Sequence, residues 1–216
     1  MIKIINPFTR RKLNKKLDIS RTVHIESLPG KSFSKKLLTQ FKSHKDMNKE
    51  KRLLRFSEDK SIHDISNRRR KHSVDGNLGL AVAIAENRGY NLKKATNMHI
   101  HHNSEKIRCL PSIADIKSYF EDYDRIRTKK FMISFLDDNN IKEIGRLHLI
   151  IKPRVINEID ESGKSLEKIF KHYMPLKELN QYNYTDFMVM CEQIFDIKYV
   201  GLNGYKFDPK TYKFGK

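Results

Sequence analysis

Histidine and carboxylate side chains occur at metal-ligand spacing in one stretch, "NMHIHHNSEKIRCLPSIADIKSYF", residues 97–120. His99 and His101 are separated by one residue, so on a strand both imidazoles point to the same face. Such a pair can supply two ligands to one metal ion. Asp115 can supply a third if the loop 103–111 folds the start of the next helix back over the strand. Three protein ligands and one open position let Zn²⁺ lower the pKa of a bound water to about 7.

The same residues also fit an ordinary helix start. Ser112-x-x-Asp115 before an apolar helix resembles a capping box with Asp in place of Glu. Ser112 would accept a hydrogen bond from a backbone N–H, and Asp115 would favour the positive end of the helix dipole. The three neighbouring histidines could equally extend a polyanion-binding face. The helix cap and the metal site are compatible, and both interpretations stay open from these residues.

The segment "HIHHNSEKIRCLPSIADI" resembles the hallmark of the JAMM (MPN or JAB) metalloproteases, which is His-x-His-Pro, a loop and Ser-x-x-Asp. The resemblance covers about residues 97–153. His99 and His101 match the ligand pair, Asp115 the third ligand and Ser112 the serine. It implies a Zn²⁺-dependent hydrolase of peptide or isopeptide bonds, in which Ser112 helps to stabilise the oxyanion.

The family also has a catalytic glutamate on an earlier strand, some tens of residues upstream of the histidines. By that spacing, Glu58 in "RLLRFSEDK" is the best candidate for the general base. Glu86 lies closer but falls in an apparent helix. Without such a glutamate, the resemblance implies a scaffold that keeps the fold and lacks the activity.

A nuclease of the HNH type is the rival enzyme interpretation of "HIHHN", and a positive charge would suit it. That chemistry needs a further histidine or asparagine on the following helix, and "IADIKSYFEDYD" supplies only carboxylates. The chain has no P-loop, no Gly-x-Gly-x-x-Gly and no Cys-x-x-Cys motif. Nucleotide and thiol-redox functions therefore have no motif to support them.

The net charge of +18 favours a polyanionic partner and is concentrated near the N-terminus. Residues 1–75 hold 21 Lys and Arg against 8 Asp and Glu. The densest cluster is Arg68, Arg69, Arg70 and Lys71, which could contact phosphates or act as a nuclear localisation signal. The non-catalytic alternative is therefore a basic protein that binds nucleic acid or an acidic protein surface through residues 1–75, or that docks in a larger assembly. A solvated basic tail is the simplest explanation of the same charge.

No apolar run approaches the roughly 18 residues that span a bilayer, and "MIKIINPFTRRKLNKK" lacks the apolar middle of a secretory signal. We therefore expect no membrane partner and an intracellular location, cytoplasmic or nuclear. Asn6-Pro7-Phe8-Thr9 and Asp208-Pro209-Lys210-Thr211 resemble short Asn-Pro-x-Thr-Gly-Arg segments of large DNA viruses, which implies association with a virion as another location. Two distant cysteines predict neither a disulfide framework nor a multi-cysteine zinc site.

The expected fold is α/β or α+β, with a small mixed sheet, flanking helices, a basic N-terminal arm and a helical C-terminal extension. The arm, residues 1–74, is expected to hold a helix starting at Ser34 and a helical stretch over 47–56. The JAMM-like α/β domain is expected over 75–155.

Within that domain, "NLGLAVAIAENRG" predicts a buried helix with a glycine C-cap, and "ATNMHIHH" a strand. A helix from Ser112 to about Asp124 and two strands around "DDNN" follow. The extension, residues 156–216, is expected to hold two helices, "SGKSLEKIFKHYM" and "NYTDFMVMCEQIF". Its aromatic and basic tail either packs on a neighbour or contacts nucleic acid.

Overall fold

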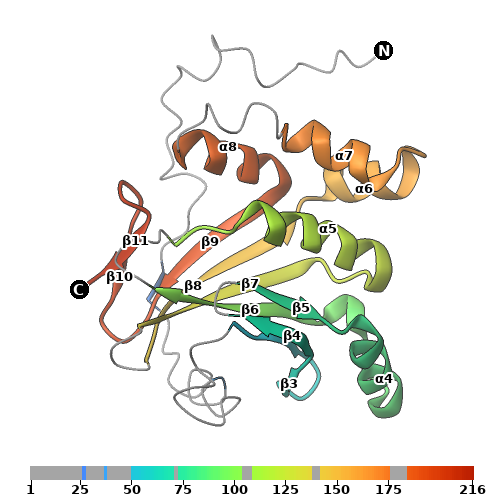
Figure 1. Ribbon diagram of the computed structural model, residues 1–216, viewed down its shortest axis with the longest axis horizontal. Helices are drawn as coiled ribbons and strands as arrows, with labels where there is room; N and C mark the ends of the chain where they lie inside the picture. The colour runs from blue at the N-terminus through green and yellow to red at the C-terminus, as the bar shows by residue number, and fades with distance from the viewer. Residues whose placement is uncertain are drawn as a thin grey trace.

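The computed structural model describes residues 26–27, 37, 50–70, 73–103, 109–137, 142–175 and 184–216 (Figure 1). Its elements in chain order are β1 (Glu26–Ser27), β2 (Arg52–Arg55), β3 (Ile62–Asp64), β4 (Ser66–Arg70), β5 (Ser73–Gly76), α4 (Leu78–Arg88), η2 (Leu92–Lys94), β6 (Thr96–Asn103), α5 (Ile113–Ile126), β7 (Lys130–Asp137), β8 (Lys142–Ile151), α6 (Pro153–Glu161), α7 (Leu166–Tyr173), α8 (Tyr184–Ile194), β9 (Phe195–Gly201), β10 (Lys206–Asp208) and β11 (Lys213–Gly215).

Within this part of the chain, seven strands form one mixed sheet in the order β1-β9-β8-β7-β6-β2-β3. β6 and β7 are parallel neighbours, and α5 is the crossover that a parallel pair requires. β2 pairs with β6, and β8 with β7 and β9, all antiparallel. The expected mixed α/β fold is confirmed. No helix among the described residues is long and apolar enough to cross a membrane.

One face of the sheet carries the main hydrophobic core. Side chains alternate along β7, so Phe131, Ile133 and Phe135 pack toward α5, while Met132 and Leu136 belong to a second apolar cluster with Leu53, Met98 and Ile100. In Figure 1, α5, α6, α7 and α8 lie on the same side of the sheet. This arrangement fixes α5 over the strand that carries the histidines.

The helical stretch expected over 47–56 is wrong, because this segment contains the strand β2. Leu53 packs in the cluster with Met98, whereas Leu54 packs in another cluster with Phe56. Two neighbouring leucines on opposite sides are the mark of a strand. Pairing with β6 therefore outweighs the helix-like local pattern.

The sheet draws strands from all three segments expected from the sequence. β2 comes from the expected arm and β9 from the expected C-terminal extension. The main core likewise joins residues from α5 and β7 to residues from α7, α8 and β9. The segments divided by the expected boundaries at 74 and 155 therefore contribute strands to one sheet.

The aromatic tail packs on the sheet. The rings of Tyr199 and Phe207 stack with centroids 3.6 Å apart, and Tyr212 and Phe214 are buried beside them. β8 ends at Ile151, and Pro153 then occupies the first turn of α6. That position suits proline, because its missing N–H has no partner within a helix's first turn.

Candidate metal centre

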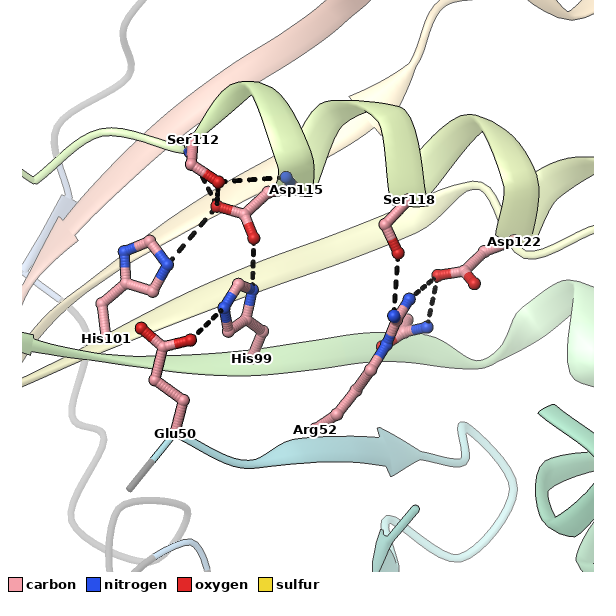
Figure 2. Close-up of polar contacts among 9 residues, drawn as sticks. Glu50, Arg52, His99, His101, Ser112, Asp115, Ser118 and Asp122 are labelled. Carbon is pink, nitrogen blue, oxygen red and sulfur yellow. Dashed lines mark hydrogen bonds and ion pairs between the residues drawn. The ribbon is translucent and has the colours of Figure 1, made fainter. Parts of the chain in front are cut away.

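The strand β6 presents polar side chains on one face and apolar ones on the other. Asn97, His99 and His101 point toward α5 (Figure 2), whereas Met98 and Ile100 are buried in the cluster on the opposite face. This is the alternation expected of His-x-His on a strand. The two imidazoles lie with ring centroids 4.5 Å apart.

The start of α5 is held by the capping box that the sequence predicts. The Asp115 N–H donates to Ser112 Oγ at 3.1 Å, and the Ser112 N–H donates back to Asp115 Oδ2 at 2.7 Å. The Ser112 hydroxyl also donates to Asp115 Oδ2 at 2.7 Å. The Asp115 carboxylate is thus fixed on the face of α5 that packs toward β6.

Asp115 contacts both histidines from above. Its Oδ1 lies 3.1 Å from His99 Nδ1, and its Oδ2 lies 3.4 Å from His101 Nε2. The helix cap and the cluster therefore use the same residues. These distances bring His99, His101 and Asp115 together, and their binding of a metal ion stays a prediction.

Glu50 completes the cluster from the segment just before β2, the strand that pairs with β6. Lys51 O accepts a hydrogen bond from Ile100 N, which extends the β2–β6 pairing by one residue beyond Arg52. Glu50 is the residue immediately before Lys51 in the chain. Glu50 Oε2 lies 3.3 Å from His99 Nε2. Glu50, His99 and His101 offer ligand atoms that all lie within 4.8 Å of one another, so this group could hold a metal ion.

The buried carboxylates favour the charged form of His99. Burial disfavours the charged form of His99, but the charges of Asp115 and Glu50 outweigh it and raise the pKa of the imidazole. Burial likewise opposes ionisation of Asp115, yet His99 and His101 hold its pKa well below the usual range. A metal ion would replace the protons between these groups, because only deprotonated ligands bind metal.

Neither of the glutamates chosen from the sequence belongs to the cluster. Glu58 lies in the exposed turn between β2 and β3, where it accepts hydrogen bonds from Ser57 Oγ at 3.0 Å and Asn91 N at 3.2 Å. Glu86 is exposed on α4. Glu50 was missed because the segment before Phe56 has a helix-like pattern. If "RLLRF" is taken as a strand, Glu50 is the glutamate that lies just before it.

The basic cluster is only partly described. The backbone of Arg68, Arg69 and Arg70 lies in β4, which pairs with β5, and Lys71 lies outside the described residues. Binding of phosphates by this basic cluster stays a prediction. For the HNH-type alternative, α5 would have to add a histidine or asparagine to the cluster, and the sequence of α5 contains neither.

The chain matches no protein-family model and no curated protein sequence. Two imidazoles and a carboxylate are the donor set that Zn²⁺ takes in catalytic sites with an open position. A second carboxylate beside such a set can act as a general base.

Proposed function

We propose that this chain is a metal-dependent hydrolase of peptide or isopeptide bonds, of the JAMM type. His99, His101 and Asp115 would hold Zn²⁺, and Glu50 would be the general base. The position of Glu50 carries the proposal, because its carboxylate and one nitrogen of each imidazole lie within 4.8 Å of one another, whereas Glu58 lies outside the cluster. Glu50 lies two residues before β2, upstream of the histidines in the chain, as the resemblance requires of its glutamate.

The donor set fits the ion. Asp115 approaches both imidazoles, and its second role in the capping box fixes it in place. Bound at this cluster, Zn²⁺ would supply a water of lowered pKa and would polarise an amide carbonyl. Zn²⁺ is preferred to Mg²⁺ or Ca²⁺ because imidazole nitrogen suits the softer ion.

Glu50 and Ser112 then have distinct tasks. Glu50 accepts a proton from the attacking water and returns it to the departing amine, as a buried carboxylate close to the reacting atoms can do. Ser112 lies at the exposed start of α5 with its hydroxyl on Asp115. From there the hydroxyl can turn to donate to the oxyanion that forms on the carbonyl oxygen.

The assay uses the full chain, stripped with chelator and reloaded with zinc, on quenched-fluorescence peptides and lysine-linked isopeptides. We expect cleavage that needs zinc and that falls by at least about 100-fold in Glu50→Gln. Glu58→Gln is the matched control, because Glu58 is exposed and lies away from the cluster. Zinc-dependent cleavage that survives Glu50→Gln would remove Glu50 as the base and with it this mechanism.

The charge supports a second proposal, that residues 1–75 bind a polyanion such as nucleic acid and bring the centre to its target. The surplus of positive charge in this segment carries it. We expect affinity for duplex DNA or RNA that falls steeply with salt, and a shallower slope when Arg68, Arg69, Arg70 and Lys71 are replaced by glutamine. Salt-insensitive binding, or none, would contradict this role.

A further inference from the structure

A second polar cluster lies beside the candidate metal centre and is built around buried Arg52 (Figure 2). Its guanidinium pairs with Asp122, donates from Nη1 to Ser118 Oγ at 2.8 Å, and donates from Nε to Asn97 Oδ1 at 3.3 Å. Asn97 Nδ2 in turn donates to Asp122 Oδ2 at 2.7 Å. We call these four residues the Arg52 clamp.

The clamp and the centre are carried by the same three structural segments. Glu50 precedes Arg52 by two residues, and Asn97 precedes His99 by two, so each pair shares one face of its strand. On α5, Asp115, Ser118 and Asp122 follow at i, i+3 and i+7, which is one stripe of a helix. Each segment thus gives one residue or more to both clusters.

The register ties the two clusters closely together. Arg52 is the cross-strand partner of His99. Its fork of donors joins β2 to β6 through Asn97 and to α5 through Ser118 and Asp122, with a geometry that a single ammonium group could not reproduce. The contacts of Glu50 and Asp115 with His99 depend on the spacing of these same elements.

The backbone of Gly76 packs directly against the side chain of Arg52. A Cβ added at Gly76 would lie 2.6 Å from Arg52 Cδ and 2.8 Å from Arg52 Nε. A methyl group there would therefore push the guanidinium while leaving every polar group of the clamp present.

We propose that Arg52 is a positioning residue, which through the clamp sets the distances of Glu50 and Asp115 from His99. The inference rests on the proposed metal centre, since that is the site being positioned. Groups that orient metal ligands without touching the metal commonly change metal affinity or activity by 10- to 100-fold when altered.

The test removes the buried pair as a whole with Arg52→Met combined with Asp122→Leu, because removing one partner alone leaves an unpaired buried charge. The matched control is Arg146→Met with Glu143→Leu. That pair is also a buried Arg–carboxylate pair of the same sheet, joined by 2.7 Å contacts, and Glu143 also accepts a hydrogen bond from Ser134 of β7. Zinc affinity is measured by competition with a chromophoric chelator, and the imidazole ¹⁵N shifts of His99 and His101 are recorded in metal-free protein.

We expect the clamp variant to lose 10- to 100-fold in zinc affinity and to shift the imidazole signals, while the control changes affinity by less than about threefold. Equal losses in both variants, or affinity within threefold of wild type in the clamp variant, would overturn the proposal. If wild-type protein binds no zinc, the metal centre itself fails. The imidazole shifts then decide alone: a change confined to the clamp variant supports positioning, and no change overturns it.

Two milder variants keep the test decisive if the double variant does not fold. Gly76→Ala displaces Arg52 without removing a polar group, and should lower zinc affinity in the same direction. Arg52→Lys keeps the charge but loses the fork, so it should fall between wild type and the clamp variant. Wild-type affinity and imidazole shifts in both would contradict the proposal.

Discussion

The carboxylate of Glu50 lies 3.3 Å from Nε2 of His99, while Asp115 lies 3.1 Å from the other nitrogen of the same imidazole. His99 is thus held between two buried carboxylates that come from different elements, one before β2 and one on α5. In the proposed mechanism one carboxylate is a ligand and the other a base. Removing the charge of Asp115 should therefore affect zinc affinity differently from removing the charge of Glu50.

Asp115→Asn should weaken zinc binding by more than about 100-fold, since losing a ligand should exceed the usual effect of an outer-shell change. Glu50→Gln should keep zinc affinity within about tenfold of wild type. Titration of each variant against a chromophoric chelator measures both. If Glu50→Gln loses the metal and Asp115→Asn retains it, the ligand would be Glu50, and the roles assigned to the two carboxylates would be reversed.

His148 should make the protein less stable in acid. Burial, with help from Arg146 and Lys198, lowers the pKa of its imidazole to about 4. The unfolded chain binds this proton near pH 6.5 and the folded chain only near pH 4, so the stabilisation is present above pH 6.5 and is lost as pH falls toward 4. The effect should reach about 2 to 3 kcal/mol at pH 4.

Urea unfolding of wild type and His148→Gln at pH 7.5 and pH 4 isolates this contribution. The wild type should lose about 2 to 3 kcal/mol more than the variant over that interval. Equal losses would show that the folded protein holds His148 with an ordinary pKa.

Gly201→Ala should destabilise the β9 end of the sheet. An added Cβ would overlap the backbone carbonyl oxygen of Tyr205, which cannot swing aside as a side chain could. We expect a loss of about 3 kcal/mol in the free energy of unfolding. Gly215→Ala on β11 is the control, because a Cβ there meets nothing within 4 Å. Equal stability of the two variants in denaturant titrations would refute the overlap.

The sequence predicts the local half of the site well. The spacing of His99, His101, Ser112 and Asp115 lies within one strand, one loop and one helix start, and periodicity of 2 and capping chemistry are enough to orient these residues. The strands around "DDNN" are likewise local, and β7 and β8 form there.

The other half depends on pairing between distant segments. Glu50 and His99 are 49 positions apart, and only the register of β2 on β6 brings them together. The pattern of "RLLRF" has apolar residues on adjacent positions, which fits a helix as well as a strand buried on both sides. β9 likewise joins the sheet through a long-range pairing with β8. Local sequence patterns do not show such a pairing, so the expected boundary at 155 separated two strands of the same sheet.

Metal content is the most direct test of the central claim. Plasma mass spectrometry on purified wild type, on His101→Ala with Asp115→Ala, and on Glu58→Ala compares the cluster with a glutamate outside it. The account predicts about one zinc per chain in wild type and in Glu58→Ala, and none in the double variant. No metal in wild type after zinc is supplied, or equal metal in all three proteins, would contradict it.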